Sequence, residues 1–117
     1  MIADFVTGDE NAAEWRMVLV EEGPWTDITG HLSKLQDRLY DCLDAALDGQ
    51  LAEKFPASNG KPLVIQVDCY NVPENDVRNF FDKFSKGIFS TPDYLGLECG
   101  SEYVGDIKFE INFDKIH

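Results

Sequence analysis

The sequence predicts an α/β domain of the α+β kind, a two-layer sandwich in which two helices cover one sheet. Residues 107–114 alternate apolar and polar side chains, as a strand with one buried face does. Residues 63–69 contain the apolar run LVIQV, which is typical of a central strand covered on at least one face. Residues 29–48 and 73–86 instead repeat apolar residues at helical spacing. The expected order is ββαβαββ, with both helices packed on one mostly antiparallel sheet.

The first half of the chain is expected to form a hairpin and then the first helix. Residues 3–6 and 15–20 form its two strands, separated by a polar turn. The helix ends where Gly49 can adopt the left-handed conformation of a C-terminal cap. Its candidate N-terminal caps are Thr26, Asp27 and Thr29. Its buried stripe consists of Leu32, Leu35, Leu39, Leu43 and Ala46.

The second half is expected to add a strand, a helix and two further strands. The turn signal Asn59-Gly60 precedes the central strand. A strand–helix–strand crossover between residues 14 and 69 would add a parallel pair to the sheet. Residues 94–99, interrupted by Gly96, and residues 105–114 are the expected last strands. The chain has 117 residues, the usual size of one domain, so we expect residues 1–117 to fold as one unit.

The net charge is −12, from 22 acidic and 10 basic residues. A field of this sign repels the phosphates of nucleic acid and anionic membrane surfaces, and it attracts basic proteins and cations. Solubility alone is the competing explanation, because net charge informs on association and not on fold. The charge therefore argues against nucleic-acid and membrane partners and is compatible with a basic protein partner.

The three cysteines, Cys42, Cys69 and Cys99, are an odd number at wide spacing. This pattern suits neither a disulfide framework nor a CxxC metal or redox site, so free thiols and no structural metal are expected. The N-terminus lacks the basic and apolar regions of a signal peptide. No segment has the ~20 apolar residues that span a membrane. A cytoplasmic protein fits these features.

Motifs that carry catalysis are missing from the sequence. The two histidines, His31 and His117, lie far from other candidate ligands, and no P-loop, dinucleotide fingerprint, GxSxG or HExxH is present. We therefore expect no catalytic residues and no cofactor, and a binding function in place of an enzymatic one. A small enzyme or regulator remains the alternative, and a deep pocket with convergent polar groups would indicate it.

Four aspartates of the first helix form a strip, which we call the acidic strip. They recur at steps of four, three and four residues and, at ~100° per residue, share a face about 60° wide opposite the leucine stripe. Like charges at this spacing destabilise a helix by a few tenths of a kcal/mol each. The strip is either a solvated face or a docking site for Lys and Arg; a linear row suits a metal poorly. Its members are Asp37, Asp41, Asp44 and Asp48.

Aromatic residues outside the helices are the other candidates for partner binding. Trp25 either fills the core at the turn before the first helix or projects as an interface anchor, since Trp is favoured in hot spots. Tyr residues give contact area at low entropy cost, and two of them lie among acids in the C-terminal loops. This second cluster consists of Tyr94, Tyr103, Asp93, Glu98 and Glu102.

Three segments of the chain resemble a small bacterial family of unknown function. They are VLVEEGPW (residues 18–25), HLSKLQDRLYDCLDAALDGQLAEKFP (residues 31–56) and GKPLVIQVDCYNVPENDVRNFFDKF (residues 60–84). The shared features are an acidic strand end followed by Trp, a Leu-Gln helix, a Gly-Gln-Leu step, and a strand with a second helix. The likeness spans about residues 14–84 and implies more about fold than about activity.

The resembling family is similar to polymorphic-toxin systems, including contact-dependent growth inhibition immunity proteins. The resemblance implies a bacterial cytoplasmic protein that binds and neutralises a toxin domain, and it carries over no catalytic residues. Many such toxins are basic nucleases, which matches the acidic charge. The expected partner is thus a basic toxin domain, with a homodimer left open. The rivals are an unrelated interaction module, a small enzyme or regulator, and a nucleic-acid mimic.

Overall fold

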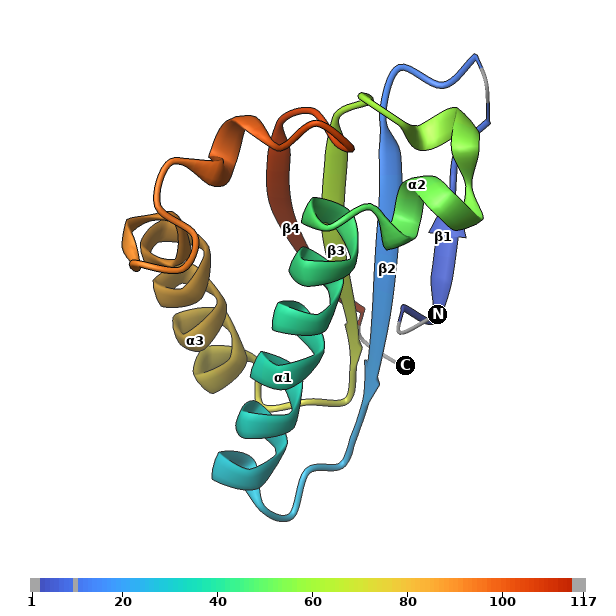
Figure 1. Ribbon diagram of the computed structural model, residues 1–117. Coiled ribbons are helices and arrows are strands. Elements are labelled where there is room, and N and C mark those ends of the chain that lie inside the picture. The colour runs from blue at the N-terminus through green and yellow to red at the C-terminus, as the bar shows by residue number, and fades with distance from the viewer. Residues whose placement is uncertain (1–2, 10, 115–117) are drawn as a thin grey trace.

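A four-stranded sheet with helices on one face makes up the computed structural model, which describes residues 3–9 and 11–114. Figure 1 shows α1 and α3 side by side in front of the sheet, with the short α2 beside β1 and β2. The strands are β1 (Phe5–Thr7), β2 (Trp15–Glu22), β3 (Leu63–Tyr70) and β4 (Ile107–Asp114). The helices are α1 (Ile28–Leu47), α2 (Gln50–Lys54) and α3 (Glu74–Gly87). The two-layer α+β class predicted from the sequence is confirmed.

The sheet is mixed, and the prediction of a mostly antiparallel sheet is wrong. The strand order is β1-β2-β3-β4; β1 pairs antiparallel with β2, whereas β2–β3 and β3–β4 are parallel. Each long helix returns the chain to the end of the sheet where the preceding strand began, so the next strand runs in the same direction. The expected crossover between residues 14 and 69 is confirmed in the β2–β3 pair.

The segment 94–99, predicted as a strand, is a set of turns that ends in a 3₁₀ helix at Leu97–Cys99. Gly96 and Gly100 bound this short helix with φ angles of 77° and 91°. Left-handed backbone at both positions prevents the extended conformation that pairing in a sheet requires. The sheet of the described residues therefore has four strands, and the loop 91–106 passes from α3 to β4 beside the end of α1.

The core lies between the helices and one face of the sheet. Leu35, Leu39 and Leu43 of α1 are fully buried, while Leu32 of the predicted stripe is only half-buried. α3 contributes Val77, Phe81 and Phe84, as its helical spacing predicts. The helix starts and stops also follow local chemistry. Asp27 caps α1 by accepting a 3.1 Å hydrogen bond from the backbone N–H of Gly30, and Gly49 after its end has a φ angle of 98°.

Arg38 joins α1 to the first two strands in what we call the Arg38 cluster. Its guanidinium lies 2.7 Å from a carboxylate oxygen of Glu21 and 2.6 Å from one of Asp4, and it donates a 3.2 Å hydrogen bond to the carbonyl oxygen of Val20. The backbone N–H of Val20 donates to Asp4 at 2.7 Å. Burial alone would raise the pKa of the Asp4 carboxyl, but the hydrogen bonds from Val20 and Arg38 hold it below its usual value.

The cysteines are free thiols in three separate places. Cys42 of α1 and Cys69 of β3 are buried, and Cys99 is exposed. Burial raises the pKa of both buried thiols to about 12. Only Cys99 therefore lies where a solvent reagent reaches it readily.

Candidate partner-binding surface

The four aspartates of the acidic strip are all exposed along the outer face of α1 and its C-terminal cap. Asp37 and Asp41 make no ion pair or hydrogen bond among those found in the described residues. The arginines of the described residues pair instead with acids elsewhere: Arg16 with Glu14 and Glu110, Arg38 with Asp4 and Glu21, and Arg78 with Glu74. The strip is thus left to solvent without an internal counter-charge from an arginine.

Tyr94 joins the loop after α3 to the acidic strip. Its hydroxyl donates a 2.7 Å hydrogen bond to a carboxylate oxygen of Asp44, and its ring stacks on Tyr40 of α1 with centroids 5.9 Å apart. Burial, the bond to Asp44 and the Asp44 charge together raise the pKa of Tyr94, so it remains a neutral donor at physiological pH. The predicted second cluster and the strip therefore form one surface at this point.

Tyr103 meets the strip at its C-terminal end. Its ring lies over Gly49, where a Cβ atom would stand 3.1 Å from the ring. Asp48 there accepts hydrogen bonds from the backbone N–H of Gln50 at 3.1 Å and from the Gln50 side chain at 2.8 Å. A hydrogen bond with Glu102 raises the pKa of Tyr103, which is 37% exposed. The C-terminal end of the acidic strip therefore contributes hydrogen bonds to the local structure in addition to its charge.

The remaining predicted residues are placed differently. Glu98 is exposed in the 3₁₀ helix Leu97–Cys99, and no ion pair found in the described residues joins it to the strip. Trp25 is only 8% exposed and stacks on His31 at the start of α1, with centroids 4.9 Å apart and planes 9° from parallel. This placement corresponds to the core-filling alternative, at the end of α1 far from Asp48. His117 and the rest of 115–117 lie outside the described residues.

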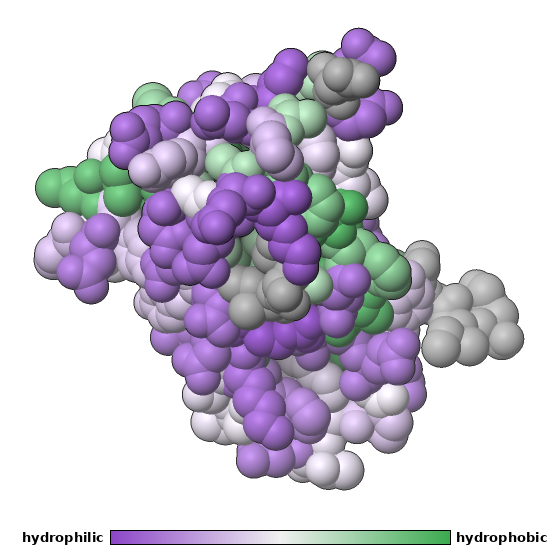
Figure 2. Space-filling view, turned by 45° about the vertical axis from the view of Figure 1, so that its right-hand side comes forward, coloured by the Kyte–Doolittle hydropathy of each residue, from purple (hydrophilic) through white to green (hydrophobic). Residues whose placement is uncertain are grey.

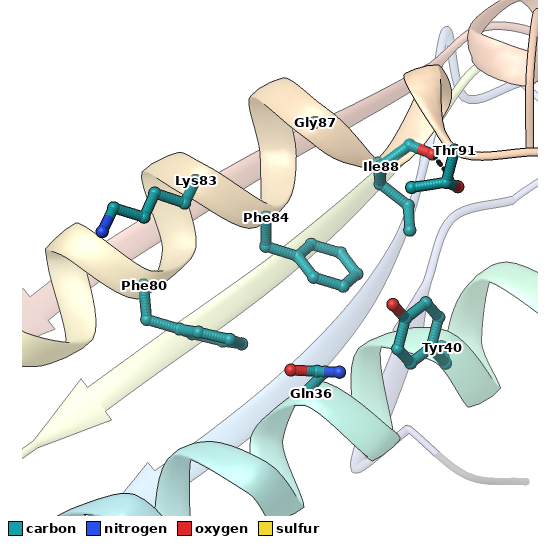
Figure 3. Close-up of a pocket in the computed structure, with 8 residues that line it drawn as sticks. All are labelled: Gln36, Tyr40, Phe80, Lys83, Phe84, Gly87, Ile88 and Thr91. Carbon is teal, nitrogen blue, oxygen red and sulfur yellow. Dashed lines mark hydrogen bonds between the residues drawn. The ribbon is translucent and has the colours of Figure 1, made fainter.

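A groove between α1 and α3 borders the acidic strip and was not predicted from the sequence. It has a volume of about 320 Å³. Figure 3 shows the rings of Tyr40, Phe80 and Phe84 and the side chain of Ile88 directed into the space between the two helices, whereas Lys83 extends away along α3. Its main lining residues are Gln36, Tyr40, Phe80, Phe84, Gly87 and Ile88. The lining is mostly apolar, and Figure 3 shows the hydroxyl of Tyr40 directed into the same space.

The two lips of this groove differ in charge. At ~100° per residue, Asp44 and Asp37 follow directly after Gln36 and Tyr40 around α1, so the α1 lip is acidic. The α3 lip carries Lys83. An apolar floor between oppositely charged lips can accept an apolar group and fix the orientation of charges beside it.

The face of the molecule drawn in Figure 2 is mostly hydrophilic. Figure 2 shows purple over most of the visible face, with green confined to small areas. The large apolar side chains that are most exposed are Leu95, at 69%, in the loop after α3, and Phe5, at 58%, in β1. Scattered apolar residues of this kind are normal for a protein surface. Within the described residues, no three His, Cys, Asp or Glu side chains gather as a metal site.

No helix in the described part of the chain is both long and apolar enough to cross a bilayer. The architecture is that of a small α+β protein with exposed acids on many elements, four of which form a row along α1 and its C-terminal cap. A family model matches residues 2–99, and the chain belongs to this family, described as a family of unknown function (DUF6572). The family assignment covers every helix and the first three strands, while β4 lies beyond it. No curated protein and no solved structure matches the chain.

Proposed function

We propose that this protein binds a basic protein through the acidic strip of α1, and that the partner is a toxin domain that it neutralises, as immunity proteins do. The observation that carries the proposal is the strip itself, four exposed carboxylates on one helix face in a chain of net charge −12. Like charges in this arrangement weaken the helix, and folding alone gives no reason to keep Asp37 and Asp41, which make no hydrogen bond or ion pair found in the described residues. A basic partner would supply the missing counter-charge.

Long-range attraction is the mechanism by which such a strip acts. Exposed charges steer a partner toward the surface before contact, which raises the association rate and loses its effect beyond a Debye length of ~8 Å at physiological salt. The bound protein would neutralise a toxin by covering its basic substrate groove or by blocking access beside it. The toxin identity rests on the resemblance of residues 14–84 to immunity-type families, and the charge supports the basic character of the partner.

The strip is tested most cleanly with its two acids that have no structural task. The variant Asp37→Asn/Asp41→Asn removes two negative charges and leaves the bonds of Asp44 and Asp48 intact. Asp82→Asn/Asp106→Asn is the matched control, because both residues are exposed, lie outside α1 and belong to no ion pair of the described residues. Stopped-flow association with the product of the gene immediately upstream, where the proposal expects a toxin domain to be encoded, is measured at low and at high salt.

The strip variant should associate about three- to tenfold more slowly at low salt, and the difference should shrink at high salt. The control should change the rate less, although its net charge is the same. Equal rates for both variants would reduce the strip to a solvated face. Neutralisation is tested separately by co-expression: the protein should restore growth to cells that produce the upstream toxin domain. Absence of binding to that domain would contradict the immunity role.

A further inference from the structure

We propose that the groove between α1 and α3 seats one apolar side chain of the basic partner, with the partner's Lys or Arg residues placed along the α1 lip. This inference rests on the proposed function and adds the chemistry of the recognised segment, an apolar anchor flanked by basic residues. The acidic strip then attracts the partner, and the groove retains it.

The floor of the groove has the character of a site for a side chain. Phe84 and Ile88 are buried, and Phe80 and Tyr40 are half-buried, so their rings keep apolar area open to the groove. The volume of about 320 Å³ lies at the lower end of the roughly 300–1,000 Å³ typical of ligand pockets. A space of this size between two helices fits one or a few apolar side chains better than a whole helix.

Gly87 keeps the wall of the groove open. It is the last residue of α3, with φ −103° and ψ −19°, values that any residue adopts. A Cβ atom at Gly87 would meet no atom of the described residues within 4 Å. Neither the backbone conformation nor packing within the protein therefore requires glycine here, although glycine weakens a helix. Gly87 lines the groove, so its wall has no side chain at this point.

Charge complementarity selects the occupant. The α1 lip carries Asp37 and Asp44, and the α3 lip carries Lys83. A basic residue beside the anchor gains attraction on the α1 side and meets repulsion on the α3 side. Tyr94 holds Asp44 in place through its 2.7 Å hydrogen bond, so part of the acidic lip is fixed before binding. The favoured partner segment therefore has Lys or Arg on one flank of its apolar residue.

Two synthetic helical peptides probe the groove without knowledge of the partner. Both are rich in lysine; one has a single central leucine and the other has alanine at that position. Binding to the full chain is measured by calorimetry and by amide chemical shifts in NMR. Burying a leucine side chain should make the leucine peptide bind about tenfold more tightly, and it should shift the amides of Gly87 and Thr91.

Gly87→Leu fills the groove and should remove the advantage of the leucine peptide. Asn79→Leu adds the same side chain to an exposed position of α3 outside the groove lining, and it should retain the advantage. If Gly87→Leu loses its circular dichroism signal, Phe80→Ala serves instead, since it removes one wall of the groove and should lower the advantage several-fold. Asp37→Asn/Asp41→Asn should weaken both peptides alike.

The outcomes separate the two proposals. Equal affinity for the two peptides, or a leucine advantage that survives in Gly87→Leu, would overturn the groove inference and leave strip-mediated binding intact. If neither peptide binds at low salt, basic segments are not recognised, and the proposed function fails together with the groove. A leucine advantage that Gly87→Leu alone abolishes supports both.

Discussion

Two groups of acids lie around α1, those of the Arg38 cluster and those of the acidic strip. The first group is paired with an arginine and the second is not. On one side of α1, Arg38 lies within 2.7 Å of Glu21 and 2.6 Å of Asp4, and it ties the helix to β1 and β2. On another side, Asp37 and Asp41 face solvent with no ion pair among the described residues. The chain thus compensates its acids where they meet the sheet and leaves them uncompensated where α1 meets solvent.

This difference indicates which acids contribute to the stability of the fold. The side chain of Glu21 is 13% exposed, and a carboxylate removed from water in this way needs a partner. The strip acids keep their hydration, so they need none, and their mutual repulsion is a small cost to the helix. Residues that break a local rule without a gain in the fold are the ones expected to serve a function.

The largest expected effect comes from removing Arg38. Arg38→Ala leaves Glu21 partly buried without its counter-charge and frees the carbonyl of Val20, so we expect the free energy of unfolding to fall by about 2 kcal/mol. Urea denaturation measures it. Glu74→Gln is the control, because its 3.6 Å pair with Arg78 lies on the exposed surface of α3 and should contribute less than about 0.5 kcal/mol. If both variants lost a similar free energy of unfolding, the Arg38 cluster would contribute no more to stability than an exposed ion pair.

The pH dependence of stability gives a smaller effect at Asp4. Its folded-state pKa is lowered, so its contribution is fully present above the unfolded pKa of about 3.9 and is lost as pH falls through the folded value. Asp4→Asn should therefore cost about 0.5 kcal/mol near neutral pH, a figure kept low because the side chain is 41% exposed. Between about pH 5 and pH 3, the variant should lose less stability than the wild type.

Asp106→Asn serves as the matched comparison for this titration, since Asp106 is exposed and belongs to no ion pair of the described residues. Urea unfolding at several pH values should show that the free energy of unfolding of this variant depends on pH as it does in the wild type. If the free energy of unfolding of Asp4→Asn depended on pH as in the wild type, the ion pair between Arg38 and Asp4 would not form in solution.

The smallest effect, and one of opposite sign, is expected in the strip. Asp37→Asn/Asp41→Asn should raise the free energy of unfolding by a few tenths of a kcal/mol, because it relieves repulsion at a spacing of four residues. Thermal unfolding at low salt measures this, and added salt should reduce the gain by screening. A loss of stability would show that these acids support the fold, and would weaken the case for a binding role.

Periodicity predicted most of the fold. The helices expected at residues 29–48 and 73–86 are observed at Ile28–Leu47 and Glu74–Gly87, because each carries its apolar residues on one face. The mostly antiparallel strand direction was predicted wrongly, since the alternation in residues 107–114 is the same in parallel and antiparallel sheets. The error at residues 94–99 arose because two left-handed glycines outweighed a short apolar pattern.

The candidate surface was predicted only in part. Helical spacing correctly placed Asp37, Asp41, Asp44 and Asp48 on one exposed face. The hydrogen bond from Tyr94 to Asp44 joins residues 50 positions apart in the sequence, and a local sequence pattern does not predict a contact of that separation. The groove depends on how α1 and α3 lie against each other and on the missing side chain of Gly87. Gly87 was the one signal in the sequence, a glycine at the end of a strongly apolar helical stripe.

The Arg38 cluster also has a consequence for solubility in crowded solutions. The pairing of β2 with β1 reaches only to Val18, so within the described residues no strand pairs with this edge of β2 at Val20. Both polar backbone groups of Val20 are nevertheless occupied, the N–H by Asp4 and the carbonyl by Arg38. A strand from another molecule seeking these groups would have to displace a charged pair to reach them. The Arg38 cluster thus protects this edge of the sheet against pairing with a strand of another molecule. Its side chains occupy the backbone groups that a longer β1 would otherwise pair.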